Sequence, residues 1–248
     1  MKNYFCIVLF IGYCSNSLAQ YTNVNPINCK ISDHEKELVE AMAKYQVNYY
    51  KRIFDFEPTT VNIDLIGKHK DYLKLSHSST TKYKTAGFYN PSAQKAFVDK
   101  TRNAYLKTMY HETQHAIIHQ VLPNVPAWIN EGMSELFECF EVSKDQIKPD
   151  IQGYKFYKMK EYAGKNSLNL RTFLGLTHSQ WQELNGTEEG YSYTVSYSFV
   201  SFLFMKYPNS VDMILQKLKQ GRNSIQAIEY ATKKEFNQIE MEFITAMR

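Results

Sequence analysis

The sequence predicts an α+β fold, with a small mixed or antiparallel sheet in its N-terminal half and a mainly helical C-terminal half. Short alternating or β-branched runs occur before residue 100, whereas helical periodicity dominates from about Arg102 onward. Gly and Pro are scarce, at 10 and 7 of 248 residues, and 15% of the residues are aromatic. This composition excludes collagen-like, low-complexity and typical disordered chains. The length suits one domain, with a β-containing lobe over about 20–100 and a helical lobe over about 101–248.

Residues 1–19 have the pattern of a secretory signal peptide. Lys2 is the only charged residue among them, residues 5–13 are mostly apolar, and Ser17-Leu18-Ala19 offers a cleavage site. The apolar run is too short to span a bilayer, which needs about 20 residues, so no membrane span is expected. A buried N-terminal helix is the alternative. The mature chain is therefore predicted to begin at Gln20 and to be secreted or periplasmic.

Cysteine content and net charge give expectations about disulfide bonding and about binding partners. Cys29 and Cys139 remain after the leader, so a disulfide or two buried thiols are both open. The formal net charge is +4, from 29 basic and 25 acidic residues without a long basic run. A nucleic-acid partner is therefore not expected.

The N-terminal elements follow from capping, alternation and turn signals. Ser32 is a good cap for a helix, residues 59–66 alternate and are β-branched, and Asn90-Pro91-Ser92 is a turn signal between two short apolar runs. The expected elements are an extended lead-in over 21–32, a helix over 33–54, a strand over 59–66, a polar stretch to about residue 85, and antiparallel strands over 86–89 and 96–98.

The C-terminal elements follow from helical spacing and from proline positions. Pro123 and Pro126 separate the first two helices, and Pro208 follows the third. The expected helices span 102–121, 127–141, 190–206, 209–219, 223–231 and 234–247.

The first of these helices carries His111-Glu112-Thr113-Gln114-His115, an H-E-x-x-H pattern. Helix positions four apart lie about 40° from each other and roughly 6 Å along the axis. Two imidazoles can therefore converge on one ion, while Glu112 projects beside them. The alternative is a solvated helix face. His119 lies about 12 Å along the axis from His111, too far to share an ion with it.

A third metal ligand is expected on the next helix. The short, Pro-punctuated connection over 122–126 predicts that the two helices pack antiparallel. His115 lies about 10 Å before this turn and Glu131 about 7.5 Å after it, so their side chains return to similar heights. Glu131 can then complete a site for one zinc ion with an open fourth position. Glu135, one turn further, is placed to accept a hydrogen bond from a ligand imidazole.

These motifs together resemble the gluzincin metallopeptidases, which include thermolysin-like enzymes and the zinc aminopeptidases. The more specific half is Trp128-Ile129-Asn130-Glu131-Gly132-Met133-Ser134-Glu135, and the resemblance covers roughly residues 85–205. It implies a zincin-like fold and zinc held by His111, His115 and Glu131, with Glu112 as general base. The implied activity is zinc-dependent hydrolysis of peptide bonds in a peptide or protein substrate.

A tyrosine is implied by a third match. Residues 193–203 are similar to the gluzincin segment Y-x-x-G-x-x-x-x-x-x-L, whose tyrosine donates a hydrogen bond to the developing oxyanion. The resemblance makes Tyr193 the candidate. Tyr191 and Tyr197 compete with it because Ser196 stands where the pattern has Gly, and a core role is the alternative for all three.

The strand that borders the cleft in these families departs from the aminopeptidase pattern. Aminopeptidases carry G-A-M-E-N there, and its Glu holds the free amine of the substrate. The matching stretch at 85–90 has no acidic residue, so an endopeptidase is favoured. The expected substrate-binding edge strand comprises Ala86, Gly87, Phe88 and Tyr89. The rival functions are a secreted zinc-binding or interaction domain without catalysis and an aromatic binding surface without metal.

Overall fold

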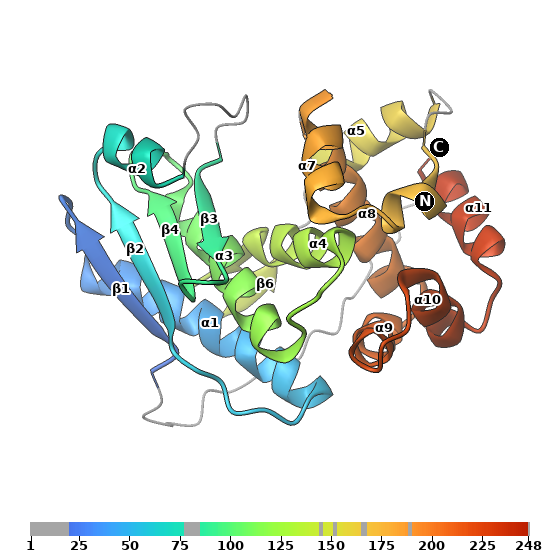
Figure 1. Ribbon diagram of the computed structural model, residues 1–248, viewed down its shortest axis with the longest axis horizontal. Helices are drawn as coiled ribbons and strands as arrows, with labels where there is room; N and C mark the ends of the chain where they lie inside the picture. Colours follow the sequence, from blue (N-terminus) through green and yellow to red (C-terminus); the bar gives the residue numbers. More distant parts are fainter. Residues whose placement is uncertain are drawn as a thin grey trace.

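The computed structural model describes residues 20–76, 85–143, 146–150, 153–164, 168–187 and 190–247. The predicted signal peptide lies outside these ranges. Within them, the chain forms a four-stranded mixed sheet, a two-stranded hairpin and a set of helices that dominate the C-terminal half (Figure 1). The predicted α+β class is therefore confirmed. Among the described residues, every helix is too short or too polar to cross a bilayer.

The four-stranded sheet has the order β1-β2-β4-β3. β1 (Thr22–Ile27), β2 (Val61–Ile66) and β4 (Lys95–Asp99) run parallel, whereas β3 (Gly87–Asn90) is antiparallel to β4. The expected lead-in therefore includes a paired strand, and the expected strands over 59–66, 86–89 and 96–98 are confirmed with small shifts of their ends. β3 is an edge strand, and no described strand pairs with its outer side.

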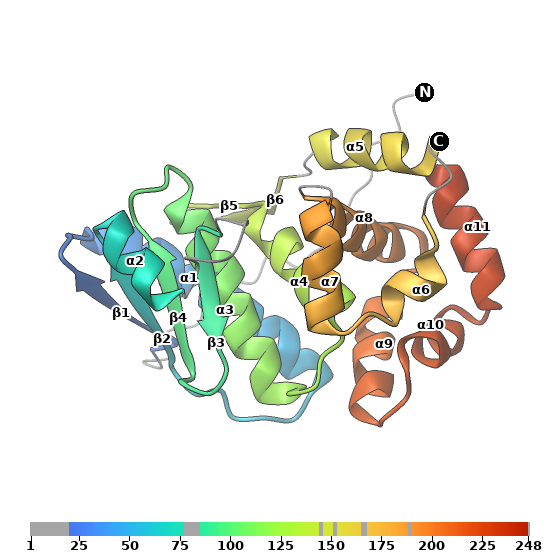
Figure 2. The ribbon, with the colours of Figure 1, turned by 45° about the horizontal axis from the view of Figure 1, so that its top comes forward.

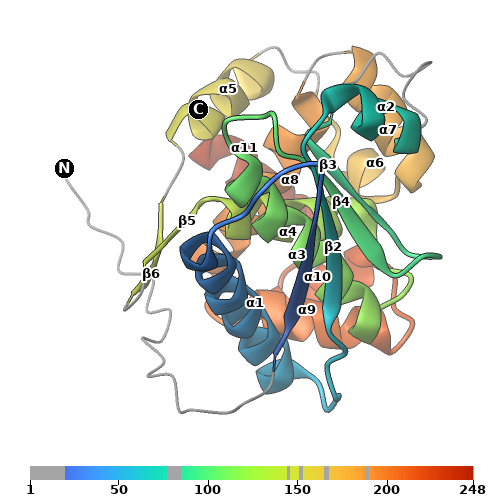
Figure 3. The ribbon, with the colours of Figure 1, turned by 90° about the vertical axis from the view of Figure 1, so that its left-hand side faces the viewer.

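The two long helices of the N-terminal half lie against this sheet. α1 (Asp33–Ile53) contacts β1 and α3, and α3 (Tyr105–Val121) contacts β2, β3 and β4. Figure 3 shows the sheet nearly edge-on with α1 on one side. Alternate residues of β2 and β4 are buried in the core, because a strand places successive side chains on opposite faces; they are Val61, Ile63, Leu65, Ala96 and Val98. α3 thus lies between the sheet and the helical half, with most of its surface buried.

The N-terminus of α1 is fixed by the predicted cap. The Ser32 hydroxyl accepts from the Glu35 backbone N–H, and the Glu35 carboxylate accepts from the Ser32 N–H and from the Tyr105 hydroxyl. The bond from Tyr105, and then those from Ser32, lower the pKa of Glu35 from 4.5 to about 2. This carboxylate ties the start of α1 to the start of α3.

We expect Glu35 to make stability depend on acidic pH. Its pKa is lowered on folding, so its contribution is fully present above pH 4.5 and is lost as the pH falls toward 2. Glu35→Gln should cost about 1 kcal/mol of unfolding free energy at neutral pH, a typical capping contribution. Urea unfolding between pH 6 and pH 2 should show the two proteins converging in acid. The exposed Glu37→Gln serves as control, and a pH-independent difference between Glu35→Gln and the native protein would contradict the assignment.

The helical half is built around α4 (Ala127–Glu138) and α8 (Tyr191–Lys206). α9 (Ser210–Lys219), α10 (Ser224–Thr232) and α11 (Phe236–Ala246) follow, so the last three predicted helices are confirmed within two residues at their ends. α8 is buried on nearly all sides because its four serines allow close packing between its aromatic residues; these serines are Ser192, Ser196, Ser198 and Ser201.

Several elements differ from the sequence prediction. The helix predicted over 127–141 ends at Glu138, because Phe140–Val142 forms β5 and pairs with β6 (Ile147–Pro149). Four short helices were not predicted, since their polar, aromatic-rich sequences have weak helical periodicity. They are α2 (His69–Leu75), α5 (Gly153–Gly164), α6 (Leu170–Leu174) and α7 (His178–Thr187). The last three surround α8 in Figure 2 and bury Tyr162, Phe173 and Trp181.

Cys29 and Cys139, the cysteines in the part of the chain that the structure describes, are free thiols. Cys29 Sγ donates to the Leu65 carbonyl oxygen at 3.1 Å, and Cys139 Sγ donates to the Glu135 carbonyl oxygen at 2.9 Å. Each thiol therefore has its own backbone partner, and the structure contains the two thiols rather than the disulfide.

Gly132 sets the distance between α4 and α8. A Cβ atom at this position would lie 2.6 Å from the Ser196 carbonyl oxygen and 2.5 Å from Val200 Cγ2. Gly132→Ala should therefore cost about 1–3 kcal/mol of unfolding free energy, the usual range for overpacking. Urea unfolding measures this cost. Gly153→Ala is the control, because nothing lies within 4 Å of its added Cβ; equal effects of the two substitutions would contradict the close contact.

Candidate metal centre

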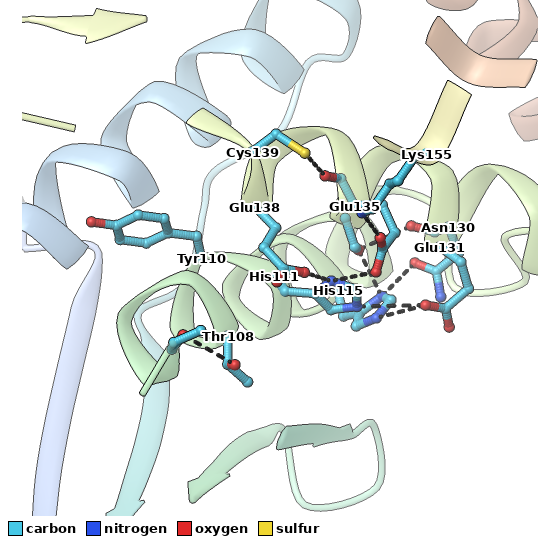
Figure 4. A network of polar contacts seen from close by, with 12 residues as sticks. Thr108, Tyr110, His111, His115, Asn130, Glu131, Glu135, Glu138, Cys139 and Lys155 are labelled. Carbon is cyan, nitrogen blue, oxygen red and sulfur yellow. Dashed lines mark hydrogen bonds and ion pairs between the residues drawn. The ribbon is translucent and has the colours of Figure 1, made fainter. Parts of the chain in front are cut away.

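Three predicted ligand residues meet between α3 and α4. His111 and His115 lie on α3, Glu131 lies on α4, and all three are buried. Glu131 Oε2 lies 3.5 Å from the Nε2 atoms of both histidines, and the three ligand atoms fall within 4.8 Å of one another (Figure 4). Two atoms bound at about 2.1 Å to a tetrahedral zinc lie about 3.4 Å apart. The spacing of this group therefore fits a single metal ion.

The electrostatics of the group also favour a cation. Burial opposes protonation of His111, but the carboxylates of Glu131 and Glu138 outweigh it and raise the pKa of His111 well above its ordinary value. Burial likewise opposes protonation of His115, and the charge of Glu131 raises its pKa. Glu131 Oε2 has no hydrogen-bond partner although it is buried. A positive charge among these three side chains is therefore stabilised, and His111, His115 and Glu131 can hold a metal ion.

Each imidazole is held by a polar partner at its Nδ1 atom. His111 Nδ1 lies 2.9 Å from Glu138 Oε2, and His115 Nδ1 lies 2.9 Å from Asn130 Oδ1. With Nδ1 carrying the proton, the Nε2 lone pair of each ring is left for an ion. Ser134 Oγ is a further neighbour of His115 Nδ1, at 3.1 Å.

Glu138 takes the position at His111 that the sequence assigned to Glu135. Glu135 Oε1 lies 3.6 Å from His111 Nδ1, beyond a good hydrogen bond, and its other oxygen pairs with Lys155 of α5. The sequence spacing could have pointed to Glu138, because this residue follows Glu131 by seven positions and therefore lies on the same face of the helix. No sequence pattern points to Lys155.

We expect Glu138→Gln to weaken metal binding more than Glu135→Gln does. Loss of a carboxylate that orients a ligand imidazole typically lowers metal affinity by about 10–100-fold. Competition with a chromogenic chelator measures the zinc affinity of each variant. The exposed Glu141→Gln is the matched control. A larger loss in Glu135→Gln than in Glu138→Gln would show that Glu135 orients His111.

Glu112 lies on the same helix between the two histidines. It is 5% exposed, and its Oε2 atom has no hydrogen-bond partner. Burial raises the pKa of Glu112, although the neighbouring imidazoles partly oppose this effect. A carboxylate with a raised pKa and a free oxygen atom is suited to accept and return a proton near neutral pH.

Among the three candidate tyrosines, Tyr193 lies beside a ligand. Its ring centroid is 6.4 Å from that of His111, and the Trp181 ring contacts its other side edge-on at 4.7 Å. Tyr191 packs instead against Tyr162, and Tyr197 lies under the Lys155 ammonium. Partial burial and the nearby carboxylates raise the pKa of Tyr193 well above 10, so its hydroxyl stays protonated and can donate.

The edge strand β3 runs directly along α3. A Cβ atom at Gly87 would lie 2.9 Å from Glu112 Oε1, so the absence of a side chain here allows the strand to pass Glu112. Phe88 stacks on Phe97 of β4, whereas Tyr89 packs against His119. Ala86 precedes the strand, and its carbonyl oxygen accepts from Asp99. The outer edge of β3 therefore offers backbone groups beside Glu112.

Comparisons with protein-family models and with curated proteins found no match to this chain.

Proposed function

We propose that this chain is a secreted or periplasmic zinc-dependent peptidase of the gluzincin type, acting as an endopeptidase. The observation that carries the proposal is the convergence of His111, His115 and Glu131 next to the unpartnered carboxylate oxygen of Glu112. A set of two imidazoles and one carboxylate leaves the fourth position of a tetrahedral zinc ion open, as in catalytic sites. A structural site has four protein ligands and no open position. The leader pattern over residues 1–19 supports export.

The chain's own residues supply the remaining chemistry. His111, His115 and Glu131 would hold the zinc ion, which would supply Lewis acidity to polarise the scissile carbonyl and to make water more acidic. Glu112 accepts the proton of the attacking water at its carboxylate and delivers it to the leaving amine. The Tyr193 hydroxyl donates a hydrogen bond to the carbonyl oxygen as that oxygen gains negative charge.

Substrate orientation is assigned to the edge strand. An extended peptide can add to the outer edge of β3 through main-chain hydrogen bonds, which are independent of its sequence. The stretch at 85–90 has no carboxylate for a free substrate amine. For this reason we favour internal cleavage over removal of N-terminal residues.

A peptide-library digest of the purified mature chain tests the proposal. The metal content is measured first, and the digest is then read by mass spectrometry with and without a chelator. We expect about one zinc per chain and internal cleavages that the chelator abolishes and added zinc restores. Zinc without cleavage would support a catalytically inactive zinc-binding domain instead. Absence of bound zinc would exclude both functions, and stepwise loss of N-terminal residues would replace the endopeptidase by an aminopeptidase.

A further inference from the structure

The surroundings of His111 contain more negative charge than one divalent ion balances. Glu112, Glu131, Glu135 and Glu138 all act on this imidazole, and the first three are at most 8% exposed. Among the described residues, Lys155 is the only lysine or arginine that forms an ion pair with any of these four glutamates. Buried carboxylates without a counter-charge are strongly unfavourable, so the position of this single lysine is significant.

Two groups of potential ligand atoms share His111. On its Nε2 side lie His115 and Glu131, which form the metal centre described above. On its Nδ1 side lie Glu135 and Glu138, and these three ligand atoms also fall within 4.8 Å of one another. The second group has the composition of a cation site: one imidazole nitrogen and two carboxylates. His111 therefore stands between two places where a cation is stabilised.

The Lys155 ammonium lies beside this second group, where it pairs with the Glu135 oxygen that faces away from His111. Lys155 is 6% exposed, it reaches Glu135 from α5, and its Nζ atom lies 4.8 Å from the centroid of the Tyr197 ring (Figure 4). Burial opposes its charge, but the Glu135 carboxylate raises the pKa of Lys155 above its usual range. The ammonium therefore stays charged, and both the carboxylate and the aromatic ring hold it in place.

We propose that Lys155 is an internal cation that occupies the Glu135–Glu138 side of His111, so that this side binds no second metal ion and His111 serves only the centre with His115 and Glu131. The pairing draws Glu135 away from His111 and leaves the imidazole Nδ1 proton to Glu138. Lys155 is thus a positioning residue that acts through Glu135. The proposal rests on the proposed function only in taking zinc as the ion of the first centre.

The number of zinc ions per chain tests this role directly. The native chain and the variants Lys155→Met, Lys155→Met with Glu135→Gln, and Lys158→Met are saturated with zinc, dialysed and measured by mass spectrometry of the metal. Methionine keeps most of the length of the unbranched side chain and removes its charge. Lys155→Met should bind a second equivalent of zinc at Glu135 and Glu138, because these two carboxylates then lack a cation, and the Nδ1 proton of His111 is released to solvent as that nitrogen joins the second ion. The added Glu135→Gln should remove that second equivalent. The exposed Lys158→Met, on the same helix, should behave as the native chain does.

Unchanged zinc content in a folded Lys155→Met variant would overturn the proposal. A second measurement covers poor folding of this variant and needs no metal. In chelator-treated protein, Glu135→Gln leaves the Lys155 charge buried and unpaired, so the double variant should unfold at a higher urea concentration than Glu135→Gln alone. Equal urea midpoints would overturn the pairing. A native chain that binds no zinc but shows this coupling would refute the proposed function and leave the Lys155–Glu135 pair intact.

Discussion

Glu112→Gln should remove nearly all peptide hydrolysis while zinc stays bound. Glutamine has nearly the same shape as glutamate, but its amide cannot accept the proton of the attacking water. General-base catalysis contributes about 10²–10⁴-fold to rate, so kcat should fall by this factor. Because His111, His115 and Glu131 are untouched, the zinc content should match that of the native chain. Single-peptide assays, with metal analysis of the same sample, measure both quantities.

The control for this substitution is Glu183→Gln, which changes an exposed glutamate of α7 in the same way. Its activity and zinc content should equal those of the native chain. Turnover retained by Glu112→Gln would rule out Glu112 as the base, and loss of zinc from this variant would mean that Glu112 is a ligand. The Oε2 atom of Glu112 is buried without a hydrogen-bond partner in the structure, so it is available to the attacking water.

Glu131→Gln should remove most of the zinc affinity. Glu131 Oε2 is equidistant, at 3.5 Å, from both Nε2 atoms and supplies the only negative charge in the ligand group. Removing this charge should weaken zinc binding more than removing a residue that only orients a ligand imidazole. We therefore expect the zinc affinity to fall by more than about 100-fold. Chelator competition gives the affinity, and hydrolysis should fall in parallel unless zinc is raised.

This result separates the ligand role from the base role. Excess zinc should restore part of the activity of Glu131→Gln but none of the activity of Glu112→Gln. The exposed Glu141→Gln provides the matched control for Glu131→Gln as well. Native zinc affinity in Glu131→Gln would disprove the ligand set and, with it, the pairing of α3 and α4 as a metal centre.

The three ligand residues were predictable from local geometry. His111 and His115 converge because positions four apart share one face of any helix. Glu131 joins them because a short connection forces neighbouring helices together, and the distances along the two axes are then nearly equal. The cap of α1 at Ser32 and the strand at 61–66 were predictable for the same reason. Each depends only on contacts between residues that are close in the sequence, within one helical turn or one pleated strand.

The helix boundaries and the outer partners of the site were less predictable. The short helices α5, α6 and α7 have weak periodicity and depend on burying single aromatic residues such as Trp181 against α8. The parallel pairing of β1 with β2 depends on a crossover through α1, which no local pattern encodes. Cys29 follows β1 and Cys139 follows α4; the relative placement of these two elements follows only from the folded chain, and there the two thiols are separate.

The amino-acid sequence alone thus predicts the α+β class, the His111 and His115 pair, Glu112 between them and Glu131 as the third candidate ligand. The class follows from where alternating and helical periodicity occur, and the four site residues follow from the period of a helix and the length of one connection. The tertiary structure decided that Glu138 rather than Glu135 holds His111, that Tyr193 is the tyrosine beside it, and that Lys155 enters the cluster from α5. Glu135 and Glu138 share a helical face, so helical spacing cannot choose between them. The choice depends on a charge that arrives from a different helix, and only the packed chain brings that charge within reach.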